Sequence, residues 1–324
     1  MRAGLGVPGY HLGVSPLRQA RAGGFVLIAL AAISWGTTGS VMTVLVARAG
    51  AEPLVVGVAR LWLAALLLLP LARTVSGPFR LPPIDRWRCI AMGACMATYQ
   101  AAYFTAVGMA GITVAALVAI CSAPLMIAAL AISWLGERLS GRLVAALALG
   151  VTGTMLLVIA PGTIVAPRGR FAAGVALALV AGAAYALYAV IAKASLARAE
   201  PLPLAALTFT AAAVLLTPAL AWSTAPAAQL AHGWPWLVYL GSVATAGAYA
   251  AYTMGLRSVP ASVAGVITLL EPLTATALGV VISGERLGIA GTLGAVLMFS
   301  ALGVLLTGRA EHRPVSGSVA SPRG

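Results

Sequence analysis

The chain has 324 residues, of which 61% are hydrophobic and 8% are charged, and its mean hydropathy is +1.01. Soluble globular domains have roughly 25% charged residues, so this composition excludes a water-facing surface over most of the chain. The formal net charge of +13 fits either nucleic-acid binding or the sorting of basic residues to one side of a membrane. The composition favours an all-α polytopic membrane protein.

Ten apolar stretches have the length of roughly 20 residues that a helix needs to cross a bilayer. In chain order they are 24–46, 53–72, 89–109, 112–135, 143–160, 171–192, 201–222, 234–256, 261–283 and 289–308. Proline or glycine stands at many of the joints, as at Pro53, Gly111 and Pro260. We therefore expect ten transmembrane helices, referred to below as spans one to ten, between tails at 1–23 and 309–324.

The basic residues are distributed unevenly over the two sides of these spans. If the N-terminus lies in the cytoplasm, 15 of the 20 Lys and Arg residues fall on the cytoplasmic side and 4 on the other. Such a bias is typical of bacterial inner-membrane proteins and predicts that both termini are cytoplasmic. The basic balance then reports topology, and we expect no nucleic-acid partner. The remaining arginine, Arg60, lies inside span two.

Two tetrapeptides recur at one interval. AEPL stands at 51–54 and 199–202, GERL stands at 136–139 and 284–287, and the members of each pair are 148 positions apart. This interval contains five spans, an odd number, so the second copy crosses the membrane in the opposite direction. We predict two inverted five-helix repeats, 24–160 and 171–308, joined by a linker at 161–170. Inverted repeats are typical of secondary transporters, whose binding site lies near the bilayer midplane.

Three phrases support this assignment: ARLWLAALLLLP (59–70), SAPLMIAALAISWLGERLSGR (122–142) and LEPLTATALGVVISGERL (270–287). Their order, spacing and duplication resemble the EamA-type transporters of the drug/metabolite transporter superfamily. The resemblance implies export or exchange of small metabolites, including amino acids, without ATP hydrolysis. It also implies that spans one, three, four, six, eight and nine line a central cavity.

The GER motif itself is interpreted as a structural hairpin. Gly136 and Gly284 suit the left-handed conformation that ends a helix. Glu137 and Glu285 would then lie near the positive end of the following helix, where a carboxylate is favourable.

Glu271 is the only one of the seven acidic residues that falls inside a predicted span. An ionisable group at such depth is costly and usually marks a substrate or proton path. Thr268 and Thr274 share its helix face and could hydrogen-bond it. Pro272 lacks a backbone N–H, which predicts a local distortion of the helix. The alternative is a protonated carboxyl that serves packing alone.

Arg60 is the second candidate, and its role has two alternatives. Its side chain could extend to the outer interface, or it could bind a carboxylate, either of the solute or of Glu271. At the repeat interval Arg60 corresponds to Thr208, and Glu271 corresponds to Ala123. The two charges therefore break the repeat symmetry, as a site for an asymmetric molecule would.

Aromatic residues at helical spacing give the remaining candidates. Three pairs each form one helix face, on spans three, six and eight, and a tryptophan adds a face to span one. They are Tyr99 and Tyr103, Tyr185 and Tyr188, Tyr249 and Tyr252, and Trp35. Each pair alone fits helix packing, but three pairs on cavity-type spans favour the lining of a site for an organic solute.

Together these features predict a secondary-active exporter of amino acids or related metabolites, with proton exchange through Glu271 as a further hypothesis. An uptake carrier or a facilitator for another solute is the alternative. An intramembrane enzyme is disfavoured because His11, His232 and His312 all lie outside the spans and no metal or catalytic motif occurs. We expect no cofactor, no metal and no catalytic residue. The partners expected are the bilayer, a small solute and protons, and the sequence leaves the oligomeric state open.

Overall fold

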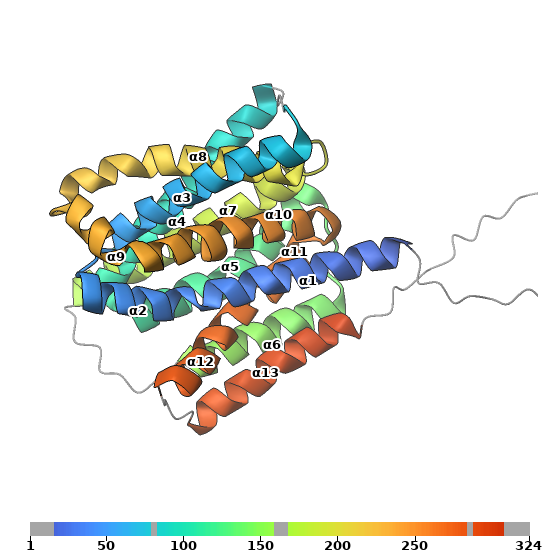
Figure 1. Ribbon diagram of the computed structural model, residues 1–324. Helices are drawn as coiled ribbons and strands as arrows, with labels where there is room; N and C mark the ends of the chain where they lie inside the picture. Colours follow the sequence, from blue (N-terminus) through green and yellow to red (C-terminus); the bar gives the residue numbers. More distant parts are fainter. Residues whose placement is uncertain (1–15, 79–82, 159–167, 284–287, 308–324) are drawn as a thin grey trace, which may run out of the picture.

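The computed structural model describes residues 16–78, 83–158, 168–283 and 288–307, and these residues form a helical bundle without strands (Figure 1). The elements are α1 (Pro16–Gly36), α2 (Thr38–Ala49), α3 (Pro53–Ser76), α4 (Pro83–Ala110), α5 (Ile112–Leu135), α6 (Gly141–Val158), α7 (Arg168–Ser195), α8 (Pro201–Leu216), a 3₁₀-helix (Thr217–Trp222), α9 (Pro226–Gly241), a π-helix (Ser242–Gly247), α10 (Ala248–Ser258), α11 (Ala261–Ile267), α12 (Leu270–Ser283) and α13 (Ile289–Leu306). Among the described residues, seven helical segments are long and apolar enough to cross a membrane, and Gly141–Leu157 is a shorter apolar helix.

The predicted fold is confirmed. Each of the ten predicted spans is helical, and a span that is interrupted comprises two or more of the elements above; five spans form each repeat. Helices of different repeats lie against one another: α4 packs against α7 and α8, α5 packs against α7, and α1 packs against α10. The last span of each repeat stands apart, because α6 packs chiefly against α13 at one edge of the bundle (Figure 1). Glycines allow this close pairing, since a Cβ at Gly153 would lie 2.7 Å from the carbonyl oxygen of Gly294.

Several spans are interrupted although the sequence predicts each as a single helix. Span one is divided at Thr37 into α1 and α2, and span nine is divided at Thr268 and Leu269 into α11 and α12. Span eight contains the π-helix between α9 and α10, and span seven ends in the 3₁₀-helix. Spans three, four and six are continuous helices. Irregular backbone at membrane depth is tolerated where it is buried in protein or lines a cavity.

The first GER motif has a different role from the one predicted. Gly136 ends α5 in the left-handed conformation with φ of 67°, but the N-terminus of α6 is capped by Ser140, whose Oγ accepts the Leu143 N–H at 3.2 Å. The Glu137 carboxylate instead accepts the backbone N–H groups of residues 261 and 262, at 2.7 and 3.1 Å, and the Ser262 hydroxyl at 2.5 Å. The prediction that Glu137 serves the next helix is wrong, because α11 of the other repeat offers it three donors.

Lys193, near the end of α7, lies at the same end of the bundle. Its Nζ donates to the carbonyl oxygens of Leu256 at 2.8 Å, Arg257 at 3.3 Å and Val259 at 2.7 Å, where α10 ends. A cation at a helix C-terminus satisfies carbonyl groups that have no partner within the helix.

The predictions for the second GERL (284–287), including Glu285, and for most of the linker and the two tails lie outside the described residues.

Candidate functional site

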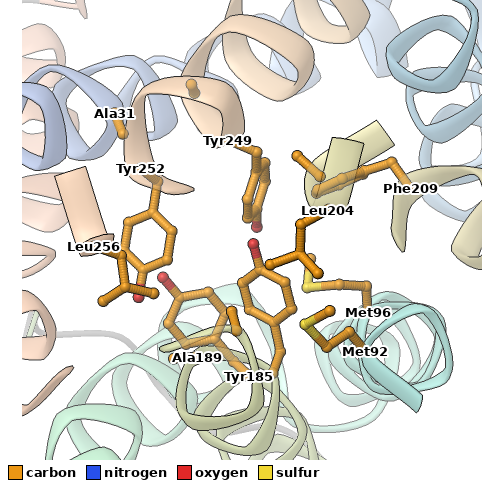
Figure 2. Close-up of a cluster of buried hydrophobic side chains, with 14 of the residues drawn as sticks. Ala31, Met92, Met96, Tyr185, Ala189, Leu204, Phe209, Tyr249, Tyr252 and Leu256 are labelled. Carbon is orange, nitrogen blue, oxygen red and sulfur yellow. The ribbon is translucent and has the colours of Figure 1, made fainter. Parts of the chain in front are cut away.

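The aromatic faces predicted on spans one, six and eight meet in the interior of the bundle. The ring centroid of Trp35, in α1, lies 4.7 Å from that of Tyr249, 5.4 Å from that of Tyr252 and 6.3 Å from that of Tyr185. Figure 2 shows Tyr249 and Tyr252 of α10 pointing towards the helix that bears Tyr185. Tyr188 joins them at 5.9 Å from Tyr249. These rings form one buried cluster.

The predicted pair on span three extends this cluster. The Tyr99 ring lies 5.8 Å from that of Tyr185 and 5.9 Å from that of Tyr103. All seven predicted aromatic residues are therefore connected through ring contacts. Sequence reasoning missed Phe209 of α8, whose ring centroid is 4.5 Å from that of Tyr249 (Figure 2). Because α8 is apolar on all sides, no periodicity distinguished this phenylalanine from its neighbours.

Arg60 points into the bundle rather than towards the outer interface. The residue is 8% exposed, and its Nε–H donates to the Thr245 Oγ1 at 3.0 Å. Thr245 belongs to the π-helix, and its own hydroxyl donates to the Leu240 carbonyl oxygen at 2.7 Å, five residues earlier. Single π-turns inside helices are frequent at functional sites. The sequence did not predict a role for Thr245.

Glu271 lies half-buried in the first turn of α12. The predicted distortion beside Pro272 is present, because span nine is interrupted just before Glu271 and the Glu271 N–H donates to the Thr268 carbonyl oxygen at 3.0 Å. The two threonine hydroxyls donate to backbone carbonyl oxygens and not to the Glu271 side chain. The Thr268 hydroxyl donates to the Gly265 carbonyl oxygen at 2.8 Å, and the Thr274 hydroxyl donates to a backbone carbonyl of its own helix at 2.8 Å. Threonine hydroxyls inside helices commonly bond the preceding turn in this way.

The interruptions of spans one and nine touch each other at Gly36. A Cβ at this glycine would lie 2.6 Å from the Glu271 carbonyl oxygen and 2.6 Å from the Thr274 Cβ. Only a glycine permits this approach, and it places Trp35 next to the start of α12. Gly36 is one of 36 glycines in the chain, and no sequence pattern distinguishes it from the others.

The two charges lie beside the aromatic cluster without forming a salt bridge to each other in the described part of the chain. They are nevertheless within electrostatic range of each other. Glu271 lies against Gly36, the neighbour of Trp35, and Arg60 bonds Thr245, which precedes Tyr249 by one helical turn. The structure therefore brings both predicted charges and the aromatic cluster into one region.

Several polar atoms of this region have no partner among the described residues. The Trp35 Nε1 and the Thr38 hydroxyl are fully buried without a hydrogen bond. The Arg60 Nη atoms and the Glu271 carboxylate oxygens make no hydrogen bond within the described ranges either, but they are not fully buried. A buried polar group without a partner costs about 1–3 kcal/mol, so such groups suit a site that binds a polar ligand.

Comparison with known proteins identifies the family. The model of the EamA-like transporter family matches residues 22–159 and 172–307. The "Uncharacterized transporter YwfM" of Bacillus subtilis (strain 168) is 36% identical over 302 residues, which cover 91% of this chain and 96% of that protein. An "Uncharacterized transporter" of Archaeoglobus fulgidus is 25% identical over 287 residues, covering 88% of this chain and 96% of the relative.

A solved crystal structure shares the fold, with a TM-score of 0.75, 21% identity, and coverage of 88% of this chain and 96% of that one. Together with the apolar helices, these matches show a multi-pass membrane protein of a transporter family. The chain belongs to the EamA-like transporter family.

Proposed function

We propose that the protein is a secondary carrier that exports amino acids or related small metabolites, and that proton exchange through Glu271 drives the export. The observation on which this rests is the Glu271 carboxylate, which has no hydrogen-bond partner in the described residues and lies where two interrupted helices meet. Ionisable groups at membrane depth are functional candidates by default. The family is one of transporters, which favours a carrier over an enzyme.

The chemistry of the site suits a zwitterionic solute. The guanidinium of Arg60 can bind a carboxylate through two parallel N–H groups. Glu271 can bind the ammonium group when it is ionised, and a proton when the solute has left. The tyrosines and Trp35 then surround the apolar part of the solute. Because proton and solute compete for one carboxylate, a proton entering from one side would drive the solute out on that side.

The orientation in the membrane forms part of the proposal. With both termini in the cytoplasm, the end of the bundle that bears Glu137 and Lys193 faces the cytoplasm, and the loop before α3 faces outward. The bias of 15 to 4 basic residues supports this orientation in a bacterial inner membrane. Rocking of the two repeats about the central site would alternately open the two ends.

The test uses proteoliposomes loaded with a mixed panel of radiolabelled amino acids. Release is measured with and without an imposed pH gradient, for the wild type, for Glu271→Gln and for Glu200→Gln. Glu200 is an exposed loop carboxylate and serves as the matched control. We expect the gradient to accelerate release from the wild type and from Glu200→Gln but not from Glu271→Gln.

Two results would overturn parts of the proposal. Release that is independent of the gradient and equal in all three proteins would assign Glu271 to packing and make the protein a facilitator. Absence of release of any amino acid from the wild type would reject the proposed solute class.

A further inference from the structure

We propose that Thr245 is a positioning residue, which holds the Arg60 guanidinium apart from Glu271 so that both charges remain available to the solute. The inference rests on the proposed function of this site and adds a residue for which no sequence pattern predicts a role. Thr245 is fully buried, and it contacts Arg60 of span two from the π-helix of span eight.

The π-helix fixes the direction in which the Thr245 hydroxyl can accept a hydrogen bond. A hydroxyl has a single proton, and Thr245 donates it to the Leu240 carbonyl oxygen at 2.7 Å. Its lone pairs are therefore left for the Arg60 Nε–H, which lies at 3.0 Å. Because Thr245 has no exposed surface, bulk water cannot replace it as the acceptor.

This contact determines which edge of the guanidinium stays free. Arginine can pair with a carboxylate through its two Nη atoms or through Nε and one Nη, since its five N–H groups form a rigid fork. Thr245 occupies Nε, so the pair of Nη atoms remains, and these make no hydrogen bond within the described residues. The free edge is the one that binds a carboxylate end-on with two parallel bonds.

Without Thr245, Glu271 would compete for Arg60. Glu271 is within electrostatic range, and attraction between opposite charges strengthens as the surroundings become less polar. No hydrogen bond in the described part of the chain other than that to Thr245 holds the Arg60 side chain. We therefore expect the two charges to pair when this bond is lost, which would block the site. The repeat counterpart of Thr245 is Ala97, in the continuous helix α4. Alanine has no hydroxyl, so only the second repeat supplies this hydrogen-bond acceptor.

The first experiment measures Arg60 directly and needs no knowledge of the solute. The purified full-length protein is treated with phenylglyoxal, and modification of the peptide containing Arg60 is followed by mass spectrometry. The Thr245→Val variant keeps the shape but removes the acceptor, and we expect it to slow the modification about tenfold, the equivalent of one hydrogen bond to a charged group. Thr245→Ser keeps the hydroxyl and should react within about twofold of the wild-type rate.

The double variant Thr245→Val with Glu271→Gln identifies the cause. If pairing with Glu271 protects Arg60, removal of the carboxylate charge restores the wild-type rate. An unchanged rate in Thr245→Val, or a rate that stays low in the double variant, would overturn the inference. Size-exclusion chromatography controls for folding, and Thr245→Ala replaces the valine variant if the latter does not yield a folded protein.

The second experiment tests whether the position of Arg60 affects binding of the solute carboxylate. Release of the amino-acid panel is compared with release of the corresponding amino-acid amides, which lack the carboxylate. We expect Thr245→Val to raise KM about tenfold for the acids, which lose both Arg60 and Glu271 to the pair, and by a smaller factor for the amides, whose ammonium competes with Arg60 for Glu271 alone. Thr245→Ser should restore both KM values. Equal effects on acids and amides would contradict a positioning role. If the wild type releases none of these compounds, the proposed function fails, while the modification rates still decide the role of Thr245.

Discussion

Two groups of three spans face each other across the aromatic cluster, and their backbones differ. The continuous group is formed by α4, α5 and α7, in which α7 packs against the other two. The interrupted group is formed by spans one, eight and nine, in which α1 packs against α10 and α12. Spans one and six, three and eight, and four and nine are counterparts at the repeat interval. Each interrupted span is therefore the counterpart of a continuous one.

The fourth and ninth spans show where this difference comes from. Both contain a proline at the equivalent position, yet α5 continues through Pro124 whereas span nine is interrupted before Pro272. Proline alone is therefore not sufficient. In span nine the Thr268 hydroxyl donates a hydrogen bond to the preceding turn, and the Thr268 carbonyl oxygen accepts one from the Glu271 N–H. Duplication thus supplies two equal frames, and a few polar residues accompany the interruption that only one of them has.

The largest effect that tests this comparison is expected at Gly36. In Gly36→Ala the new Cβ would lie 2.6 Å from the Glu271 carbonyl oxygen, and overpacking of this kind costs about 1–3 kcal/mol. We expect a lower Tm and a loss of transport of more than about tenfold, measured on the reconstituted protein. Gly39→Ala is the matched control, because a Cβ at Gly39 meets nothing within 4 Å.

A glycine of the continuous group sharpens this test. A Cβ at Gly93 of α4 would lie 2.6 Å from the Ala211 Cβ and 2.8 Å from the Ala212 backbone nitrogen. Gly93→Ala should lower Tm to a similar degree, but the folded fraction should still transport. If it lost transport as completely as Gly36→Ala, the functional difference between the two groups would not hold.

The two prolines should respond differently to substitution. A proline disfavours a helix interior by about 3 kcal/mol, so Pro272→Ala should shift span nine towards a continuous helix and turn Glu271 away from the site. We expect transport to fall about tenfold, a fraction of that energy. Pro124→Ala lies in a helix that is already continuous, and it should leave transport within about twofold. Equal losses in both variants, measured as initial rates of release, would argue against the comparison.

The hydrogen bonds that join the groups at one end should contribute chiefly to stability. Glu137, in the loop after α5, accepts three hydrogen bonds from the first residues of α11. Hydrogen bonds to a charged group are worth about 1.5–3 kcal/mol, so Glu137→Gln should lower Tm by several degrees. Glu200→Gln, at an exposed helix N-terminus without a side-chain cap bond, should leave Tm unchanged. A Tm that is the same for both variants would remove Glu137 as a link between the groups.

The smallest effect is expected at Glu52, at the other end of the bundle. Hydrogen bonds from the side chain of Gln229 and from the backbone N–H and hydroxyl of Thr224 lower the pKa of Glu52 below its ordinary value of 4.5. A lowered pKa in the folded state stabilises the protein above the ordinary value, and this stabilisation is lost as the pH falls through the folded-state pKa. Wild-type Tm should therefore drop slightly more than that of Glu52→Gln as the pH falls below 4.5. Parallel Tm curves would contradict this assignment.

The parts of the architecture that the sequence predicted depend on local pattern. Hydropathy located the ten spans, and helical spacing located the aromatic faces that meet around Trp35. The features that the sequence could not predict depend on contacts between distant segments. The role of Gly36 follows from its approach to α12, and that of Thr245 follows from a π-turn with no local signal. Glu137 was assigned to the wrong helix because its donors lie 124 and 125 residues away.

Lys193 joins the continuous group to the end of α10, and it is the only lysine in the chain. The protein therefore has a single side-chain amine, placed where the two groups of spans would separate if that end of the bundle opened. While the amine donates to three carbonyl oxygens it is a poor nucleophile. Its reaction with an amine-specific reagent would thus report separation of the groups in the native protein, without an engineered label.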